Sequence, residues 1–241
     1  IKNGQQTSIS LTIPEARTME KLAGALSKKL MIDSTTIIKT LTDSTTCAAY
    51  GYDTASIVAM FVPNTYDIYW NTSIDKFMER MEKEHAKFWN KERTEKAKAM
   101  DMTPVQVATL ASIIDEETAN TAEKPMVAGM YYNRLKTDMP LQADPTIKFA
   151  LKNFGLRRIY NKLLRVDSPY NTYKNTGLPP GPIKVASIAG IDAVLNHAVH
   201  DYIYMCAKED FSGTHNFAIT YEEHLRNAAK YSKALNERGI K

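Results

Sequence analysis

The first part of the chain carries hydrophobic residues at two different periods, which predicts a small unit of mixed strand and helix. Residues 9–13 alternate apolar and polar side chains, as a half-buried strand does. Residues 18–30 then place leucines at helical spacing. Residues 34–41 are predicted to form a second short helix, capped by Ser34 or Thr35.

Two further elements are predicted before residue 100. The apolar run 58–62 is interpreted as a buried strand, because it is short and turn residues follow it at 63–66. Residues 74–99 are predicted to form one long charged helix. Because His85 lies on the apolar stripe of that helix, we interpret it as a packed residue and not as a ligand.

A helix start is predicted at Thr103, because Thr103 and Gln106 form a capping box with Pro104 at the first helical position. At about 100° per residue, the apolar residues that follow share one arc that must face the core. These residues are Val107, Leu110, Ala111 and Ile114.

Three consecutive acids follow, and helical geometry separates them. Glu117 falls inside the apolar arc, whereas Glu116 projects toward solvent and Asp115 lies near the edge of the arc. A carboxyl on a core-facing arc must be paired or protonated, and desolvation raises its pKa toward the range that suits a general acid. Alternatively, Glu117 caps a neighbouring loop or pairs with Arg134. Periodicity alone leaves both interpretations open.

Turn residues and polar aromatic residues are dense between residues 141 and 183. Residues 141–146 place an amide and a carboxylate beside a rigid proline, and residues 170–173 read Tyr-Asn-Thr-Tyr. Residues 177–183 contain three prolines, which fix φ and make the loop stiff. Such loops can line a sugar groove, where rings stack on pyranose faces and amides bond hydroxyls; the alternative is a surface loop held rigid for packing.

Composition narrows the class of protein. The 241 residues are 44% hydrophobic and 24% charged, which is typical of a folded protein with a core. The net charge is only +4 and the basic residues are scattered, so we expect no nucleic-acid partner. Two distant cysteines, Cys47 and Cys206, exclude a disulfide-rich scaffold and a zinc finger.

No metal or cofactor is predicted. His197 and His200 lie near Asp201 in the most metal-like spacing of the sequence, but no third ligand is indicated. No phosphate-binding glycine motif occurs, so nucleotide cofactors have no support. The sequence contains no apolar stretch long enough to span a membrane and begins at Ile1, so we expect a processed or trimmed chain whose anchor would lie upstream.

Seven segments, taken in order, carry a family resemblance. Together they resemble the YceG-like endolytic murein transglycosylases (MltG family) of bacteria, most strongly from about residue 61 to residue 224. The segments are LASIIDEETA at 110–119, NRL at 133–135, LQADPT at 141–146, YNTY at 170–173, GLPPGPI at 177–183, HNF at 215–217 and YEEH at 221–224.

The resemblance implies an α+β fold in two parts. Residues 1–52 would form a small LysM-like αβ subdomain, because one strand and two short helices resemble that glycan-binding unit. Residues 53–241 would form the YceG-like catalytic domain. A purely structural role for the N-terminal part is an equal alternative.

The resemblance also implies an activity and a set of site residues. The family pattern at the helix is roughly ASIVEKET, and its catalytic glutamate corresponds to Glu117. The first acid of that pattern is Asp115 here, and Ala218 stands where some relatives carry Asn. Cleavage between N-acetylmuramic acid and N-acetylglucosamine would give 1,6-anhydromuramoyl ends, with Glu117 as general acid and then base. The expected substrate-binding residues are Gln142, Asp144, Tyr170, Asn171, Tyr173, His215 and Phe217.

Three other functions are considered. A peptidoglycan-binding module would keep the grooves without activity. A hydrolytic muramidase would use Asp115 or Asp144 as a second carboxyl and give reducing ends. A pyridoxal-phosphate-dependent aminodeoxychorismate lyase, a label that relatives have carried, would need a Schiff-base lysine and a phosphate cup, and the sequence shows no such set.

The expected partners and location follow from the substrate. Peptidoglycan strands are the expected partner, with the cell-wall synthesis machinery as a second one, and the chain is expected to act as a monomer. The resemblance implies an extracytoplasmic protein, held at the inner (cytoplasmic) membrane by an N-terminal helix that lies outside this sequence.

Overall fold

The computed structural model describes residues 7–156 and 158–239, which form two compact units. Unit 1 runs up to Ser112 and includes Pro180–Ile188, and unit 2 comprises Ile113–Pro179 and the chain from Ala189 onward. Helices and small antiparallel sheets occur together, so the α+β fold class is confirmed. The division into residues 1–52 and 53–241 stays a prediction.

Unit 1 is built on a two-stranded antiparallel sheet in which Ser8 pairs with Tyr69 and Thr12 with Thr65. The strands are separated in sequence by helices, so the sheet joins the start of the described chain to residues 65–69. The LysM-like identity of this part stays a prediction. The elements of unit 1 are β1 (Ser8–Thr12), α1 (Met19–Ser27), α2 (Ser34–Thr42), α3 (Ser44–Ala49), the 3₁₀ helix η1 (Ile57–Met60), β2 (Thr65–Tyr69), α4 (Ile74–Phe88) and α5 (Lys91–Ala99).

The cap predicted for α2 is wrong. Asp33, and not Ser34 or Thr35, is the N-cap, and its carboxylate accepts a 2.9 Å hydrogen bond from the backbone N–H of Thr36. Asp43 caps α3 in the same way, accepting from Thr46 N at 2.8 Å. An aspartate one position earlier outcompetes the hydroxyls because its carboxylate is the stronger acceptor.

The strand predicted at residues 58–62 is also wrong, since this segment begins with the 3₁₀ helix η1. The turn before it explains the difference. Asp53 Oδ1 accepts from Ser56 N and Ser56 Oγ, both at 2.7 Å, which curls the chain before the apolar run starts. The run is buried throughout and carries no periodicity, so the pattern could not separate a strand from a helical turn.

The single helix predicted at residues 74–99 is two helices, α4 and α5. The break is at Trp89, whose side chain is buried, and Asn90, whose side-chain oxygen accepts from Arg93 N at 3.0 Å and starts α5. His85 packs inside unit 1 beside the Tyr52 hydroxyl, at 3.3 Å, so its interpretation as a packed residue is confirmed.

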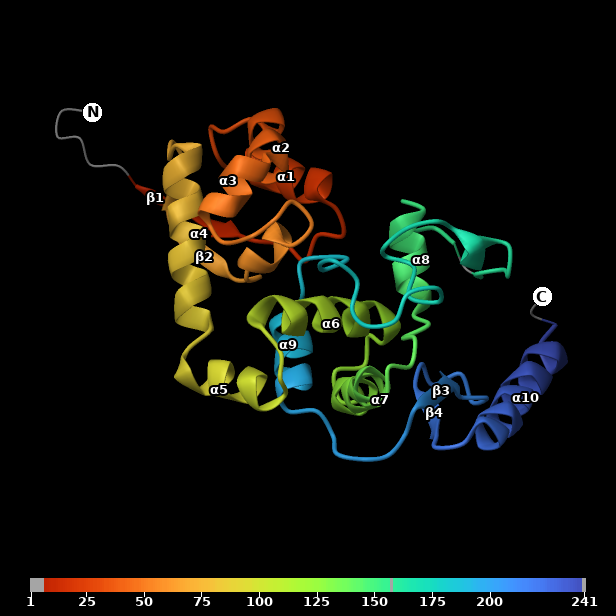
Figure 1. Ribbon diagram of the computed structural model, residues 1–241. Helices are drawn as coiled ribbons and strands as arrows, with labels where there is room; N and C mark the ends of the chain where they lie inside the picture. Colours follow the sequence, from red (N-terminus) through yellow and green to blue (C-terminus); the bar gives the residue numbers. More distant parts are fainter. Residues whose placement is uncertain (1–6, 157, 240–241) are drawn as a thin grey trace, which may run out of the picture. The chain divides into compact units, whose positions relative to one another are not determined.

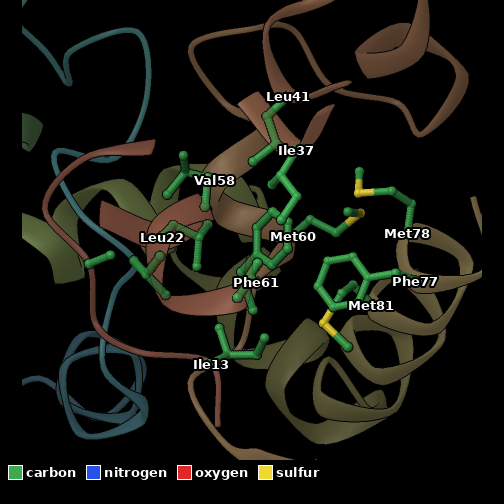
Figure 2. Close-up of a cluster of buried hydrophobic side chains, with 14 of the residues drawn as sticks. Ile13, Leu22, Ile37, Leu41, Val58, Met60, Phe61, Phe77, Met78 and Met81 are labelled. Atoms are coloured by element: carbon green, nitrogen blue, oxygen red, sulfur yellow. The ribbon is translucent and has the colours of Figure 1, made fainter. Parts of the chain in front are cut away.

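The core of unit 1 gathers side chains from both ends of its sequence. Ile13 and Leu22 lie near Phe61, and the sulfur-containing side chains of α4 lie beside Phe77 (Figure 2). Phe61 and Phe77 stack with ring centroids 6.3 Å apart. Burial of these apolar side chains is the main contribution that stabilises a unit with so little sheet.

Unit 2 contains most of the segments that carry the family resemblance. The boundary with unit 1 falls inside α6, which runs over Pro104–Glu117, and at the start of α9, which runs over Ile188–Leu195. The remaining elements are α7 (Lys124–Lys136), α8 (Asp144–Ala150), the 3₁₀ helix η2 (Leu163–Arg165), β3 (Tyr204–Ala207), β4 (His215–Ala218) and α10 (Tyr221–Glu237).

The C-terminal part of unit 2 is a hairpin-like sheet with a helix on it. β3 and β4 are antiparallel, with Tyr204 opposite Ala218 and Ala207 opposite His215. The last helix, α10, packs against both strands (Figure 1). Among the described residues, no helix combines the length and the apolar character needed to cross a membrane.

The predicted capping box at the start of α6 is confirmed. Thr103 Oγ1 accepts from Gln106 N at 3.2 Å, and Gln106 Oε1 accepts from Thr103 N at 2.7 Å. The arc predicted to face the core is buried, with Val107, Leu110 and Ile114 fully inaccessible. This local definition of the helix start sets the rotation of the whole helix, and therefore the direction of Glu117 at its end.

Candidate functional site

A cavity of about 320 Å³ lies in unit 2 and has Glu117 among its walls. Residues from α6, α7, α8, β3, β4 and α10 contribute to it, together with the segment just before α8 and Tyr173. Its polar lining residues are Glu117, Tyr131, Arg134, Gln142, Asp144, Tyr173, Tyr204, His215, Tyr221 and His224.

Glu117 is the last residue of α6, one turn after the fully buried Ile113 and Ile114 of the same helix. Burial raises the pKa of Glu117 to about 7. A hydrogen bond from Tyr131 opposes this change, and the negative charge of Asp144 adds to it. The side chain therefore keeps a proton in a substantial fraction of molecules near neutral pH, as a general acid requires.

Tyr131 of α7 is the direct partner of that acid. Its hydroxyl donates a 2.8 Å hydrogen bond to Glu117 Oε1, and the side chain is 1% exposed. Burial raises the pKa of Tyr131 well above its usual value, so the phenol stays protonated and keeps its donor. No local signal in the sequence predicts this role of Tyr131, because a tyrosine among the apolar residues of a helix looks the same as one that only packs.

The alternative partner considered for Glu117, Arg134, uses its guanidinium elsewhere. Arg134 Nε donates to the carbonyl oxygen of Ile203 at 2.6 Å, and a terminal nitrogen donates to those of Leu141 at 2.7 Å and Pro140 at 3.1 Å. The acid therefore receives its hydrogen bond from Tyr131, while Arg134 joins two segments of the cavity wall.

Asp144 and Tyr173 form the second polar pair of the cavity. Both residues were predicted, and the structure brings them together: the Tyr173 hydroxyl donates to Asp144 Oδ1 at 2.6 Å. Asp144 opens α8 just before Pro145. Burial raises the pKa of Tyr173, so its hydroxyl remains a donor to the carboxylate.

Gln142 also lines the cavity, with its backbone in the left-handed region at φ 52°. A non-glycine residue adopts this conformation only when its surroundings hold it there. Two contacts do so: Gln142 N donates to Thr172 O at 3.0 Å, and the next residue, Ala143, donates its N–H to Thr172 Oγ1 at 3.0 Å. The strained position directs the amide side chain of Gln142 toward Arg134, 3.5 Å away.

Asn171, one of the predicted substrate-binding residues, lies in a buried loop. It is fully buried and does not line the cavity, and its amide nitrogen donates to Leu164 O at 2.9 Å and Val166 O at 2.8 Å. Its side-chain oxygen accepts from Tyr173 N at 3.0 Å. Asn171 therefore holds the loop that presents Tyr173, through both the nitrogen and the oxygen of its side-chain amide.

Tyr170 and Phe217 are likewise outside the cavity lining. Tyr170 packs on Phe149 with ring centroids 4.7 Å apart, and Phe217 packs on Tyr202 at 5.7 Å. Both rings support the segments on either side of the cavity. His215 does line the cavity, and its imidazole and backbone both contact Glu123, a residue that sequence analysis missed.

Asp115 points in a different direction from Glu117, as the helical wheel predicts. It was expected near the edge of the apolar arc, but its side chain is fully packed. Its side chain is 1% exposed and forms a 2.5 Å ion pair with Lys124. Gly190 of α9 lies so close that a Cβ there would be 2.5 Å from Asp115 Oδ1. Asp115 is thus a buried structural acid and does not line the cavity.

Neither a metal nor pyridoxal phosphate has a matching set of residues here. Within residues 7–156 and 158–239, no group of three or more His, Cys, Asp or Glu is arranged to hold a metal ion. His200 Nε2 instead donates to Met126 O at 3.0 Å, and His197 Nδ1 lies 3.1 Å from Val194 O. No lysine is among the described residues that line the cavity, so a Schiff base has no amine there.

The α+β fold thus places Glu117, whose pKa is raised to about 7, at the wall of a polar cavity in unit 2. The model of the YceG-like family matches residues 1–230, and the chain belongs to this family. The crystal structure of a YceG-like protein from Listeria monocytogenes superimposes with a TM-score of 0.75 at 29% identity, covering 93% of this chain and 78% of that one.

Two curated relatives are named endolytic murein transglycosylase. One, from Bacillus subtilis, is 44% identical over 133 residues, which is 55% of this chain and 36% of the relative. Another, from Streptococcus pneumoniae, is 33% identical over 177 residues, or 70% of this chain and 31% of the relative. The chain thus matches about a third of the length of these relatives.

Proposed function

We propose that this chain contains the catalytic centre of an endolytic murein transglycosylase that cuts peptidoglycan glycan strands without water. The observation that carries the proposal is Glu117, a carboxyl whose pKa burial raises to about 7 at the wall of a polar cavity. The names of the Bacillus and Streptococcus relatives support the class of substrate.

The proposed reaction uses Glu117 twice. Protonated Glu117 donates its proton to the glycosidic oxygen between N-acetylmuramic acid and N-acetylglucosamine, and the bond from C1 to that oxygen breaks. The C6 hydroxyl of the same muramoyl residue attacks C1, and the ionised carboxylate takes the hydroxyl proton. The product carries a 1,6-anhydromuramoyl end, and the glutamate is again protonated.

One acid is sufficient for this route because the nucleophile belongs to the substrate and is held intramolecularly. Tyr131 assists by donating to the carboxylate once Glu117 has lost its proton, which stabilises the ionised form between the two transfers. A pKa of about 7 suits both halves of the cycle, because the carboxyl then holds a proton to donate near neutral pH and, once ionised, is basic enough to accept one.

The remaining predicted residues divide into two groups in this proposal. Gln142, Asp144, Tyr173 and His215 line the cavity and contact the sugars. The other three shape the walls: Tyr170 and Phe217 pack behind them, and Asn171 holds the loop of Tyr173. The expected location is extracytoplasmic, where murein lies, with the chain acting as a monomer on glycan strands.

One observation favours a second candidate function, that of a hydrolytic muramidase. Asp144 lines the same cavity, and its charge raises the pKa of Glu117, so a second carboxyl is present near the acid. Hydrolases of the retaining and inverting classes use such a pair. The Tyr173 hydroxyl already engages Asp144 at 2.6 Å, which favours a role for Asp144 in orienting groups over one as a nucleophile.

The experiment is a digestion of purified sacculi followed by mass spectrometry of the soluble products. Anhydromuramoyl ends are expected from the unchanged protein, and Glu117→Gln is expected to reduce their formation by at least about a thousandfold, as loss of a general acid and base does. Glu116→Gln, at the neighbouring acid outside the cavity lining, is the matched control and should retain activity.

Each alternative predicts a different outcome. Reducing ends in place of anhydro ends would establish the hydrolase. Binding to sacculi that Glu117→Gln leaves unchanged, with no soluble product from either form, would establish a binding module. Formation of anhydro ends at full rate by Glu117→Gln would overturn the proposed role of the acid.

A further inference from the structure

Glu123 forms hydrogen bonds with two separate segments of unit 2. It immediately precedes α7, and its side chain is 8% exposed. Oε1 accepts from the backbone N–H of His215 at 2.6 Å, and Oε2 lies 3.0 Å from His215 Nδ1. Oε2 also accepts from the Thr118 hydroxyl at 2.9 Å. One buried carboxylate therefore contacts a strand 92 residues away and the residue next to Glu117.

These contacts determine which nitrogen of His215 carries hydrogen. A carboxylate that already accepts from an N–H and a hydroxyl has only acceptor lone pairs to offer, so Nδ1 must be the protonated nitrogen. In the neutral imidazole, Nε2 is then an acceptor with a free lone pair. Among the described residues, His215 Nε2 has no hydrogen-bond partner, and His215 lines the cavity.

His200 provides a comparison within the same unit. Its Nδ1 accepts from Tyr202 N at 3.1 Å, so its Nε2 carries the hydrogen and donates to Met126 O at 3.0 Å. Both nitrogens of His200 are thus used by the backbone, as in a histidine that only packs. His215 has the opposite tautomer and uses only one nitrogen.

We propose that Glu123 is a positioning residue that fixes the Nδ1–H tautomer of His215, so that His215 Nε2 accepts a hydrogen bond from a sugar hydroxyl in the cavity. This inference rests on the proposed function, because a glycan is the hydroxyl donor. Through Thr118, the same carboxylate ties β4 to the end of α6, so the imidazole and Glu117 keep a constant spacing.

The tautomer is measured directly by ¹⁵N NMR of histidine-labelled protein at about pH 8.5, where an ordinary imidazole is neutral. The expected spectrum shows a pyridine-type Nε2 and a pyrrole-type Nδ1 for His215, and the reverse for His200 as an internal reference. A His215 ring that carries its hydrogen on Nε2 would overturn the proposal, whatever the activity of the protein.

Glu123→Gln tests the positioning role. A glutamine has one acceptor oxygen and one NH₂ group, so when its oxygen accepts from the backbone N–H of His215, its NH₂ group faces Nδ1 and favours the tautomer in which Nδ1 accepts. The expected result is the appearance of the Nε2–H tautomer in the His215 signals, together with a fall in kcat/KM. An unchanged tautomer with full activity contradicts the proposal.

His215→Asn tests the contact with the substrate. The asparagine amide can still donate to Glu123 from near the Nδ1 position, but no atom remains at the Nε2 position. Thermal unfolding should change little, while kcat/KM for glycan cleavage should fall about 10- to 100-fold, as expected when a buried hydrogen bond to substrate is lost. Full kcat/KM in this variant would show that Nε2 makes no contact.

Addition of soluble glycan strands to Glu117→Gln protein separates the two proposals. Movement of the His215 Nε2 resonance, with no anhydro product from the unchanged protein, would support the contact and reject the reaction. Anhydro product with an Nε2 resonance that does not respond to glycan would support the reaction and reject the contact.

Discussion

The hydroxyl of Tyr131 lies 2.8 Å from Glu117 Oε1, and the two side chains come from consecutive helices, α6 and α7. Burial raises the pKa of Tyr131, so the phenol stays protonated and carries no negative charge. It therefore acts on the acid in one direction, by stabilising the ionised carboxylate and lowering its pKa against the larger effect of burial.

Tyr131→Phe should move the alkaline limb of the pH–rate profile to higher pH by about one pH unit. Removing the donor takes away the contact that lowers the Glu117 pKa, so the proton is retained to higher pH. The measurement is kcat/KM for release of anhydro product between about pH 5 and pH 9.

Tyr132→Phe is the control for that variant, since the neighbouring ring packs on His197, 4.7 Å away, and does not line the cavity. Its profile should match that of the unchanged protein. A limb that moves to lower pH in Tyr131→Phe would show that the hydroxyl stabilises the protonated acid instead.

Asp144→Asn should move the same limb in the opposite direction, to lower pH, by roughly half a pH unit. The negative charge of Asp144 raises the pKa of Glu117, and asparagine removes the charge while its oxygen can still accept from the Tyr173 hydroxyl. Product analysis belongs with the kinetics. A nearly complete loss of activity, together with reducing ends in the unchanged protein, would identify Asp144 as a second catalytic carboxyl.

Gly190→Ala should destabilise the protein by about 2–4 kcal/mol, through overpacking and disturbance of a buried ion pair. The added Cβ would lie 2.5 Å from Asp115 Oδ1, and the 2.5 Å contact with Lys124 leaves that carboxylate little room to move. Urea unfolding gives the change in free energy. A stability equal to that of the unchanged protein would mean that α9 shifts freely against Asp115.

Gly24→Ala is the matched change in another helix, α1, where an added Cβ meets nothing within 4 Å. Alanine loses less backbone entropy than glycine on entering a helix, so this variant should be more stable by about 0.5–1 kcal/mol. Replacing glycine by alanine is therefore expected to lower the stability of the protein at position 190 and to raise it at position 24.

His85 should make the protein less stable as the pH falls from about 6.5 to about 4. Burial lowers the pKa of His85 to about 4 in the folded protein, against 6.5 for the free side chain. Between these values the unfolded chain binds the proton and the folded chain does not, so acid favours unfolding. The loss saturates below about pH 4 and amounts to at most about 3 kcal/mol.

The measurement is the difference in unfolding free energy between the unchanged protein and His85→Gln at several pH values. The variant should lose this part of the pH dependence, whereas His197→Gln, which removes a histidine elsewhere, should keep it. Parallel curves for the unchanged protein and His85→Gln would show that the imidazole is protonated in the folded state.

Local signals in the sequence were sufficient to predict the start of α6 and the face of this helix on which Glu117 lies. The capping box at Thr103 and Gln106 defines where α6 starts, and the 3.6-residue period then places Glu117 among buried residues. Asp144 and Tyr173 were each predicted as site residues. Their hydrogen bond could not be predicted, because it joins positions 29 residues apart.

The rest depended on information that no local window contains. The apolar run at 58–62 has no period that could distinguish a strand from the 3₁₀ helix η1, and the break at Asn90 is a single cap within a continuous run of helix-forming residues. Nothing in the local sequence marks Tyr131 or Glu123. Only the folded chain brings Tyr131 into contact with Glu117, and Glu123 into contact with His215.

The guanidinium of Arg134 joins two segments of the cavity wall. Its hydrogen bonds reach Leu141 O on one segment of the cavity wall and Ile203 O just before β3 on another, and the residue is 6% exposed. The two segments are therefore clamped at a constant separation by charge-assisted bonds that a lysine, with its single ammonium, could not reproduce. The separation of these two wall segments is therefore set by the protein itself, and in the proposed reaction a glycan strand would have to fit a cavity whose walls are already fixed.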